Sequence, residues 1–149
     1  MPAKLLIEAI SNTDKVCEWN KTLTEARVLK TINKDCVISY QVRWPGQAWE
    51  QSHQHPVQVT SDGGGGMVSA RDFVYVSKKG YDGATFVMGG QSVEFQDAPA
   101  KGKIVRAHNG PGCQMVTPTS DSQLCDFLWL MDCDYKVSLQ SPPSLSRPL

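Results

Sequence analysis

Apolar and polar positions change their spacing along the chain. Over residues 3–16, the apolar residues Leu5, Leu6, Ala9 and Ile10 recur at helical spacing, without glycine or proline between them, which predicts a helix. After this helix, short segments rich in β-branched residues are bounded by glycine, proline, asparagine or aspartate, which is typical of strands and turns. The predicted strands are 26–32, 36–42, 72–77, 84–90, 103–108, 113–117 and 124–134. The order indicates an α+β domain.

The last predicted strand, 124–134, is the longest and has one apolar face. Because side chains alternate between the two faces of a strand, the following residues share that face: Cys125, Phe127, Trp129, Met131 and Cys133. Such a face can pack on a helix, as in any α+β domain, or part of it can line a ligand cavity. The alternation is the same in both cases, so periodicity leaves both interpretations open.

Composition and charge narrow the choice of partners. A chain of 149 residues with 40% hydrophobic and 20% charged residues is typical of one globular domain. Fifteen basic and 15 acidic residues cancel, which argues against nucleic acid or an anionic surface as main partner. No apolar run approaches the roughly 18 residues of a membrane span, which favours a cytoplasmic location. The cysteines form no C-x-x-C pair and are expected to be buried thiols: Cys17, Cys36, Cys113, Cys125 and Cys133.

No motif for catalysis or for a cofactor is present. The glycine run 63–66 is not followed by G-K-[ST], and neither G-x-S-x-G nor H-E-x-x-H occurs. His53 and His55 lack a third ligand, so we expect no metal site. Arg106 and Asp126 are expected to form a framework ion pair across the sheet. The sequence therefore predicts a protein that is not an enzyme and holds no cofactor.

Several segments, in this order and spacing, resemble the StAR-related lipid-transfer (START) domain family. They are GGGGMVSARDFVYV at 63–76, KGKIVRAHNGPGC at 101–113 and CDFLWLMDCD at 125–134. Glu-Trp-Asn at 18–20 resembles the family's E-W-N at the end of a helix, and residues 69–73 resemble its P-R-D-F strand start. The resemblance is closest to the branch that contains the steroidogenic acute regulatory protein and its late-endosomal relative.

The resemblance implies a helix-grip fold, in which a curved antiparallel sheet wraps round a long C-terminal helix and encloses a tunnel for one lipid. It implies a lipid-transfer module whose ligand is a sterol such as cholesterol, with transient membrane contact by a monomer. It also implies a cytoplasmic protein, peripheral at membranes, although a longer parent protein could be membrane-anchored. The candidate lipid-binding residues are Gln41, Phe73, Tyr75, Ser77, Met88, Met115, Phe127, Trp129 and Met131.

In the sterol-binding branch, a buried acid and an arginine face each other in the tunnel, and these positions match Gln41 and Ser77 here. A neutral pair still offers hydrogen bonds to a sterol hydroxyl without the cost of burying an ion pair. The alternative is that both residues are ordinary strand residues facing solvent. The second functional hypothesis is a regulatory or interaction domain that senses a lipid or has lost binding, and a hydrolase or cyclase built on the same kind of cavity is the third.

The chain departs from the family pattern in two segments. Removing 43–59 restores the expected continuity, and Gln-Val stands at both junctions, so this segment is either a surface loop or an unspliced intron or extra exon. After Lys136 the family continues into a lid helix, whereas 137–149 is proline-rich and is expected to be disordered. The predicted organisation is a partial START domain over 1–136 without the lid helix, and a nonfunctional truncated splice product is a further alternative. Without the lid, we expect marginal stability and poor solubility.

Overall fold

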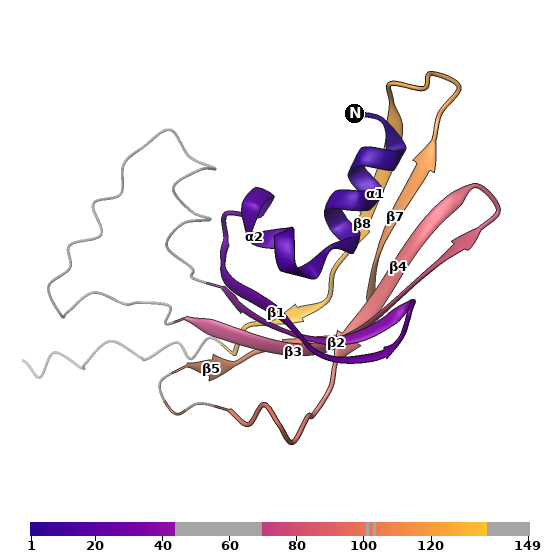
Figure 1. The fold of residues 1–149 in the computed structure, drawn as a ribbon. Coiled ribbons are helices and arrows are strands. Elements are labelled where there is room, and N and C mark those ends of the chain that lie inside the picture. Colours follow the sequence, from indigo (N-terminus) through magenta and orange to yellow (C-terminus); the bar gives the residue numbers. More distant parts are fainter. Residues whose placement is uncertain (44–69, 101, 103, 137–149) are drawn as a thin grey trace, which may run out of the picture.

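A curved antiparallel sheet with helices on one face forms the fold (Figure 1). The computed structural model describes residues 1–43, 70–100, 102 and 104–136. The elements are α1 (Ala3–Ser11), the 3-10 turn η1 (Thr13–Lys15), α2 (Val16–Trp19), β1 (Leu23–Asn33), β2 (Cys36–Arg43), β3 (Arg71–Asp82), β4 (Thr85–Ser92), β5 (Val105–Arg106), β6 (His108–Asn109), β7 (Gly112–Pro118), β8 (Cys125–Leu130) and β9 (Cys133–Asp134). The predicted α+β class is confirmed. The predicted insertion beyond Arg43, its two histidines, the glycine run and the 137–149 tail lie outside the described residues.

The main sheet has the strand order β1-β2-β3-β4-β7-β8, and each neighbouring pair is antiparallel. The short strand β5 runs parallel to β3, and β6 pairs with β9 in a separate two-stranded sheet. Tight turns connect the long hairpins. In the β3–β4 turn, Gly83 has φ +58°, a left-handed conformation that glycine adopts without strain.

The predicted helix over 3–16 ends earlier than its apolar pattern indicates. Asn12 has extended dihedral angles, φ −101° and ψ 96°, and its side chain accepts a hydrogen bond from Asp14 N at 3.2 Å. An asparagine side chain that binds a nearby backbone N–H competes with helical hydrogen bonding, which explains the break. The chain then continues as η1 and α2.

Two predicted strands are also divided. The predicted strand 103–108 is reduced to β5 and β6, with Ala107 between them. The predicted strand 124–134 ends as β8 at Leu130 and resumes as β9. β3, with 12 residues, is longer than either piece, so the expectation that the last strand is the longest was wrong. Glycine and aspartate mark turns in a sequence, but they do not show where a strand changes its partner.

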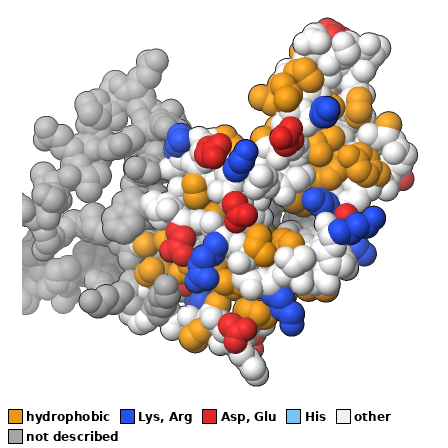
Figure 2. Space-filling view, viewed as in Figure 1, with side chains coloured by type: hydrophobic (Ala, Val, Ile, Leu, Met, Phe, Trp, Pro, Cys, Tyr) orange, Lys and Arg blue, Asp and Glu red, His pale blue; other side chains and the backbone are white. Residues whose placement is uncertain are grey.

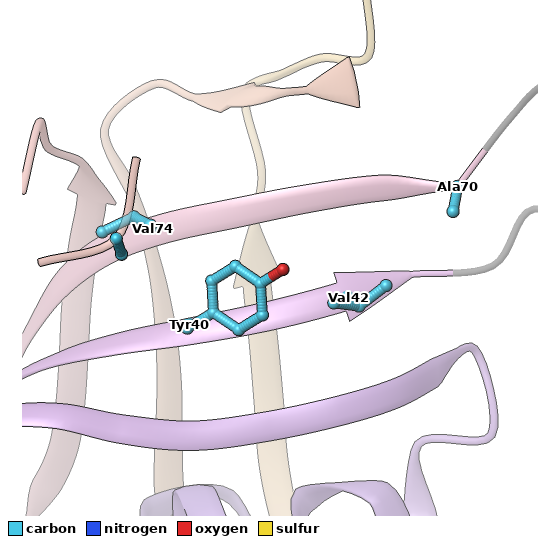
Figure 3. Close-up of a cluster of buried hydrophobic side chains, with 5 residues drawn as sticks. Tyr40, Val42, Ala70 and Val74 are labelled. Carbon is cyan, nitrogen blue, oxygen red and sulfur yellow. The ribbon is translucent and has the colours of Figure 1, made fainter. Parts of the chain in front are cut away.

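Each face of the sheet carries its own apolar cluster. On the helical face, Ile10 of α1 packs with Phe86 and Val116, and Cys125 of β8 packs against this cluster. The cluster of Tyr40, Val42, Ala70, Val74 and Ala98 is covered by partly buried residues that include Phe95 and Ile104. Figure 3 shows Tyr40 and Val42 on β2 beside Val74 and Ala70 at β3. Because side chains alternate along β2, Gln41 faces the opposite way from Tyr40 and Val42.

A buried ion pair ties β5 to β3. Arg106 Nε and Nη2 donate to the two carboxylate oxygens of Asp72 at 2.8 and 3.0 Å, and the Asp72 side chain is 0% exposed. Arg106 also donates to the carbonyl of Ala98 at 3.1 Å. The expected Arg106–Asp126 pair is therefore wrong. The strand order explains why the expected pair does not form: β5 lies beside β3, whereas Asp126 is exposed on β8, at the end of the sheet.

Tyr40 should make the stability of the fold depend on alkaline pH. Burial, followed by the negative charge of Asp72, raises the pKa of the Tyr40 hydroxyl from 10.0 to about 12. The folded state thus favours the neutral phenol. The contribution of the neutral Tyr40 hydroxyl to the free energy of unfolding is fully present below pH 10 and is lost as the pH rises through about 12. We expect the melting temperature of Tyr40→Phe to fall less steeply than that of the wild type between these pH values. Equal slopes in thermal melts monitored by circular dichroism would contradict this assignment.

Candidate functional site

A half-open cleft of about 150 Å³ lies between the helical segment and the sheet. Ile10, Val16, Trp19 and Leu23 contribute to its wall from the helices and the start of β1. Residues of β2, β3, β4, β6 and β7, and of β8 with the segment after it, line most of the rest. Ligand pockets for drug-sized molecules are typically about 300–1,000 Å³. The described residues therefore enclose only part of a lipid-sized molecule.

Most of the candidate lipid-binding residues meet in this cleft. The candidate residues that line the cleft are Gln41, Phe73, Tyr75, Ser77, Met88, Trp129 and Met131. Met115 lies outside, because Met88 is paired with Gln114, and alternation turns the next residue of β7 to the other face. Phe127 also lies outside the cleft. It stands beside Trp129, with ring centroids 6.5 Å apart, but is paired with Val116 further along the strand.

The apolar face predicted for the last strand divides between two roles. Cys125 packs against the cluster of α1, β4 and β7, whereas Trp129 lines the cleft. The two interpretations that periodicity left open, packing on a helix and lining a cavity, thus apply to different parts of one strand. Figure 2 shows apolar side chains over the upper part of the molecule, where α1, β4 and β7 lie in Figure 1.

A neutral polar pair lies inside the cleft. Gln41 Nε2 donates to the hydroxyl oxygen of Tyr75. Burial raises the pKa of Tyr75, so its hydroxyl stays protonated at neutral pH and can donate as well as accept. Ser77 also lines the cleft, but the partner of Gln41 is Tyr75. Both Gln41 and Ser77 are half-buried and line the cleft.

Tyr135 contacts two residues of the cleft, Arg43 and Phe73. Arg43 Nη1 donates to the Tyr135 hydroxyl at 2.6 Å, and its guanidinium lies 5.9 Å from the centre of the ring. Phe73 meets the same ring edge-on, with centroids 6.0 Å apart. Arg71 Nε donates to the Tyr135 carbonyl at 2.8 Å. These contacts fix the chain after β9 next to the ends of β2 and β3.

Sequence reasoning missed several residues of the cleft, among them Trp19, Asn20, Arg43, Asn109 and Gln114. Trp19 and Asn20 belong to the Glu-Trp-Asn motif, which carried the resemblance but was not connected with a site. The Trp19 indole donates to the Ala9 carbonyl at 3.0 Å, which fixes the ring between the two helices. The polar residues Arg43 and Gln114 carried no recognisable signal, because a search for a lipid site favours apolar positions.

Comparison with known proteins shows the family to which the chain belongs. The family model described as "START domain" matches residues 1–149. The chain belongs to the START domain family. This START chain is 32% identical over 130 residues to the steroidogenic acute regulatory protein of Xenopus laevis, covering 87% of the chain and 40% of that protein. It is 28% identical over 134 residues to the mitochondrial steroidogenic acute regulatory protein of Equus caballus, covering 89% and 41%. It therefore spans about two fifths of the length of these relatives.

Solved structures confirm the predicted START fold. Human STARD10 superposes with a TM-score of 0.73 at 17% identity, over 93% of this chain and 49% of that one. Human StAR-related lipid transfer protein 5 has a TM-score of 0.72 at 16% identity, over 93% and 59%. In the described part of this START chain, no helix follows α2, and the segment after Lys136, where the lid helix was expected to be missing, lies outside the described residues. Among the described helices, none is long and apolar enough to cross a bilayer.

Proposed function

We propose that the chain binds one lipid in its cleft and transfers it between membranes without catalysing a reaction. The observation that carries the proposal is the placement of the Gln41–Tyr75 pair among the apolar walls of a cleft in a START domain. A lipid needs this combination, because its chain or ring system is apolar while its polar end requires a partner. The structural likeness to human StAR-related lipid transfer protein 5, a lipid transfer protein by name, adds support through the family.

A sterol is the lipid that we propose, with cholesterol as the example. Its single hydroxyl matches the neutral donors and acceptors of Gln41, Tyr75 and Ser77. A buried hydroxyl left without a partner would cost about 1–3 kcal/mol, so these side chains select for the polar end of the ligand. The similarity to steroidogenic acute regulatory proteins favours the same ligand class.

The proposed working unit is a single chain that contacts a membrane transiently, from the cytoplasmic side, to take up and release its lipid. Two exposed apolar residues that line the cleft, Trp129 and Met131, suit such contact. A second candidate function is lipid sensing without transfer. The half-open cleft favours it, because a lipid that is only partly enclosed exchanges with the membrane without being carried through water.

Replacing Gln41 and Ser77 together with leucine tests the lipid site. We expect binding of the fluorescent sterol dehydroergosterol to weaken by about 5- to 150-fold, the equivalent of one lost polar partner. Energy transfer from tryptophan to the sterol measures the affinity. The matched control is Ser122→Leu with Gln123→Leu, which makes the same changes at exposed positions between β7 and β8 and should leave affinity unchanged.

The two candidate functions differ in a transfer assay. We expect the wild-type chain to speed dehydroergosterol transfer from donor to acceptor vesicles, and a lipid sensor would bind the sterol without this acceleration. Failure of the wild-type chain to bind any sterol would contradict the proposal. An unchanged affinity of the Gln41/Ser77 variant would show that these side chains do not contribute to sterol binding.

A further inference from the structure

Arg43 places a positive charge in the wall of the cleft. It is the last residue of β2, and Arg43 and Asp132 are the charged residues among those that line the cleft. Gln41 and Arg43 are two positions apart on β2, so they share one face of the strand. The polar part of the cleft therefore includes a guanidinium as well as the neutral pair.

The hydrogen-bonding capacity of Arg43 is only partly used. Its Nη1 group donates to the neutral Tyr135 hydroxyl. Its Nε is buried and has no hydrogen-bond partner among the described residues. The ion pairs within the described part of the chain join Arg27 to Glu25 and Arg106 to Asp72, so no described carboxylate forms an ion pair with Arg43. A buried donor without an acceptor is costly, and a ligand oxygen would remove that cost.

The surroundings of Arg43 add positive charge. Arg71 lies directly opposite Arg43 in the β2–β3 register and is 5% exposed. Its side chain donates to the backbone carbonyls of Tyr135 and Lys136. A second guanidinium group therefore lies beside Arg43 at this end of the sheet.

We propose that Arg43 binds an acidic oxygen at the polar end of the cargo, so the cleft prefers an anionic lipid over its neutral counterpart. This inference rests on the proposed function and narrows its ligand class to amphiphiles that carry a sulfate, phosphate or carboxylate. A guanidinium suits these groups because its planar N–H donors match their paired oxygens. A sterol sulfate combines such a group with the apolar body that the cleft accommodates, so cholesterol sulfate is the probe of choice.

Competition against bound dehydroergosterol tests the preference in the 149-residue protein. We expect cholesterol sulfate to displace the fluorescent sterol at about a tenfold or more lower concentration than cholesterol. In Arg43→Met this difference should disappear, whereas Arg43→Lys should keep part of it because the charge remains. Arg27→Met is the matched control, since it removes an exposed arginine on β1 that does not line the cleft, and it should behave as the wild type.

Folding and ligand source are controlled separately. Melting temperatures report whether Arg43→Met folds. Tyr135→Phe removes the acceptor of Arg43 without removing the positive charge, so this variant should keep the preference for cholesterol sulfate. Binding to phosphatidylserine vesicles without sterol distinguishes a membrane headgroup from the cargo. Loss of vesicle binding by Arg43→Met, with unchanged displacement by cholesterol sulfate, would overturn the inference.

The inference and the proposed function fail in different ways. Equal displacement by cholesterol and cholesterol sulfate in the wild type would overturn the role of Arg43 and leave sterol binding intact. An Arg43→Met variant that folds and keeps the full preference would overturn it too. If the wild type binds neither sterol, the proposed function itself is wrong.

Discussion

Arg106→Met is expected to lower the free energy of unfolding by about 3–5 kcal/mol, because it would leave the Asp72 carboxylate buried without its partner. Asp72 is 0% exposed and receives two hydrogen bonds from Arg106. These hydrogen bonds raise the pKa of Arg106 above its usual value, so the guanidinium stays charged throughout the range in which the protein is handled. Urea denaturation followed by tryptophan fluorescence measures the loss.

The exposed pair Arg27–Glu25 provides the control. Its side chains are 51% and 45% exposed, so Arg27→Met should change the unfolding free energy by only about 0–1 kcal/mol. The double variant Asp72→Leu with Arg106→Met should recover part of the loss, because it removes both charges instead of isolating one. If Arg106→Met lowers the free energy of unfolding no more than Arg27→Met does, the buried ion pair does not stabilise the fold.

The size of this effect follows from where the pair lies. Arg106 also donates to the carbonyls of Ala98 and Pro99, in the segment that covers the cluster around Tyr40 and Val74. Losing Arg106 therefore weakens the packing of this segment on the cluster. It also leaves the Asp72 carboxylate buried without a partner. Domains of this size are typically stable by about 5–15 kcal/mol, so one substitution would remove a large share of the total.

Local pattern predicted the elements of this fold better than their partners. Alternation placed Trp129 and Cys125 on one face of a strand, and the structure has both on the helical face of β8. The pairing of Arg106 with Asp72 was missed because it depends on β5 running parallel to β3, a non-local contact. The early end of α1 was missed because a single side-chain hydrogen bond at Asn12 decides it.

For the candidate site too, the sequence indicated the residues better than their partners. The family resemblance pointed to Gln41 and Ser77, and both lie in the cleft, but the hydrogen-bond partner of Gln41 is Tyr75. Which face of β7 meets the cleft depends on its register with β4. That register turns the polar Gln114 toward the cleft and the apolar Met115 away from it, the reverse of what hydrophobicity favours. A one-residue change of register reverses every face, and sequence alone does not fix it.

The strand β8 is expected to make the isolated chain self-associate. Among the described strands, its neighbour in the main sheet is β7, so its other edge carries unpaired backbone groups. Both faces of β8 also expose apolar side chains, with Phe127 44%, Leu128 50% and Leu130 54% exposed. Apolar edge strands readily pair with another chain, and charged residues on them prevent this. Without lipid or membrane, we expect the wild type to elute as oligomers at micromolar concentration in size-exclusion chromatography with light scattering, in equilibrium with the single chain that we propose as the working unit.

Leu128→Lys should shift this equilibrium toward the monomer. The residue lies on β8 but does not line the cleft, so the variant should still bind dehydroergosterol. Tyr81→Lys is the matched control, because Tyr81 is 68% exposed on the β3–β4 hairpin, away from the β8 edge, and its replacement should leave the oligomers in place. A wild-type chain that stays monodisperse and monomeric would show that this edge is protected, and would favour the single-chain working unit without any change to β8. Oligomers that persist in Leu128→Lys would place the association on another surface.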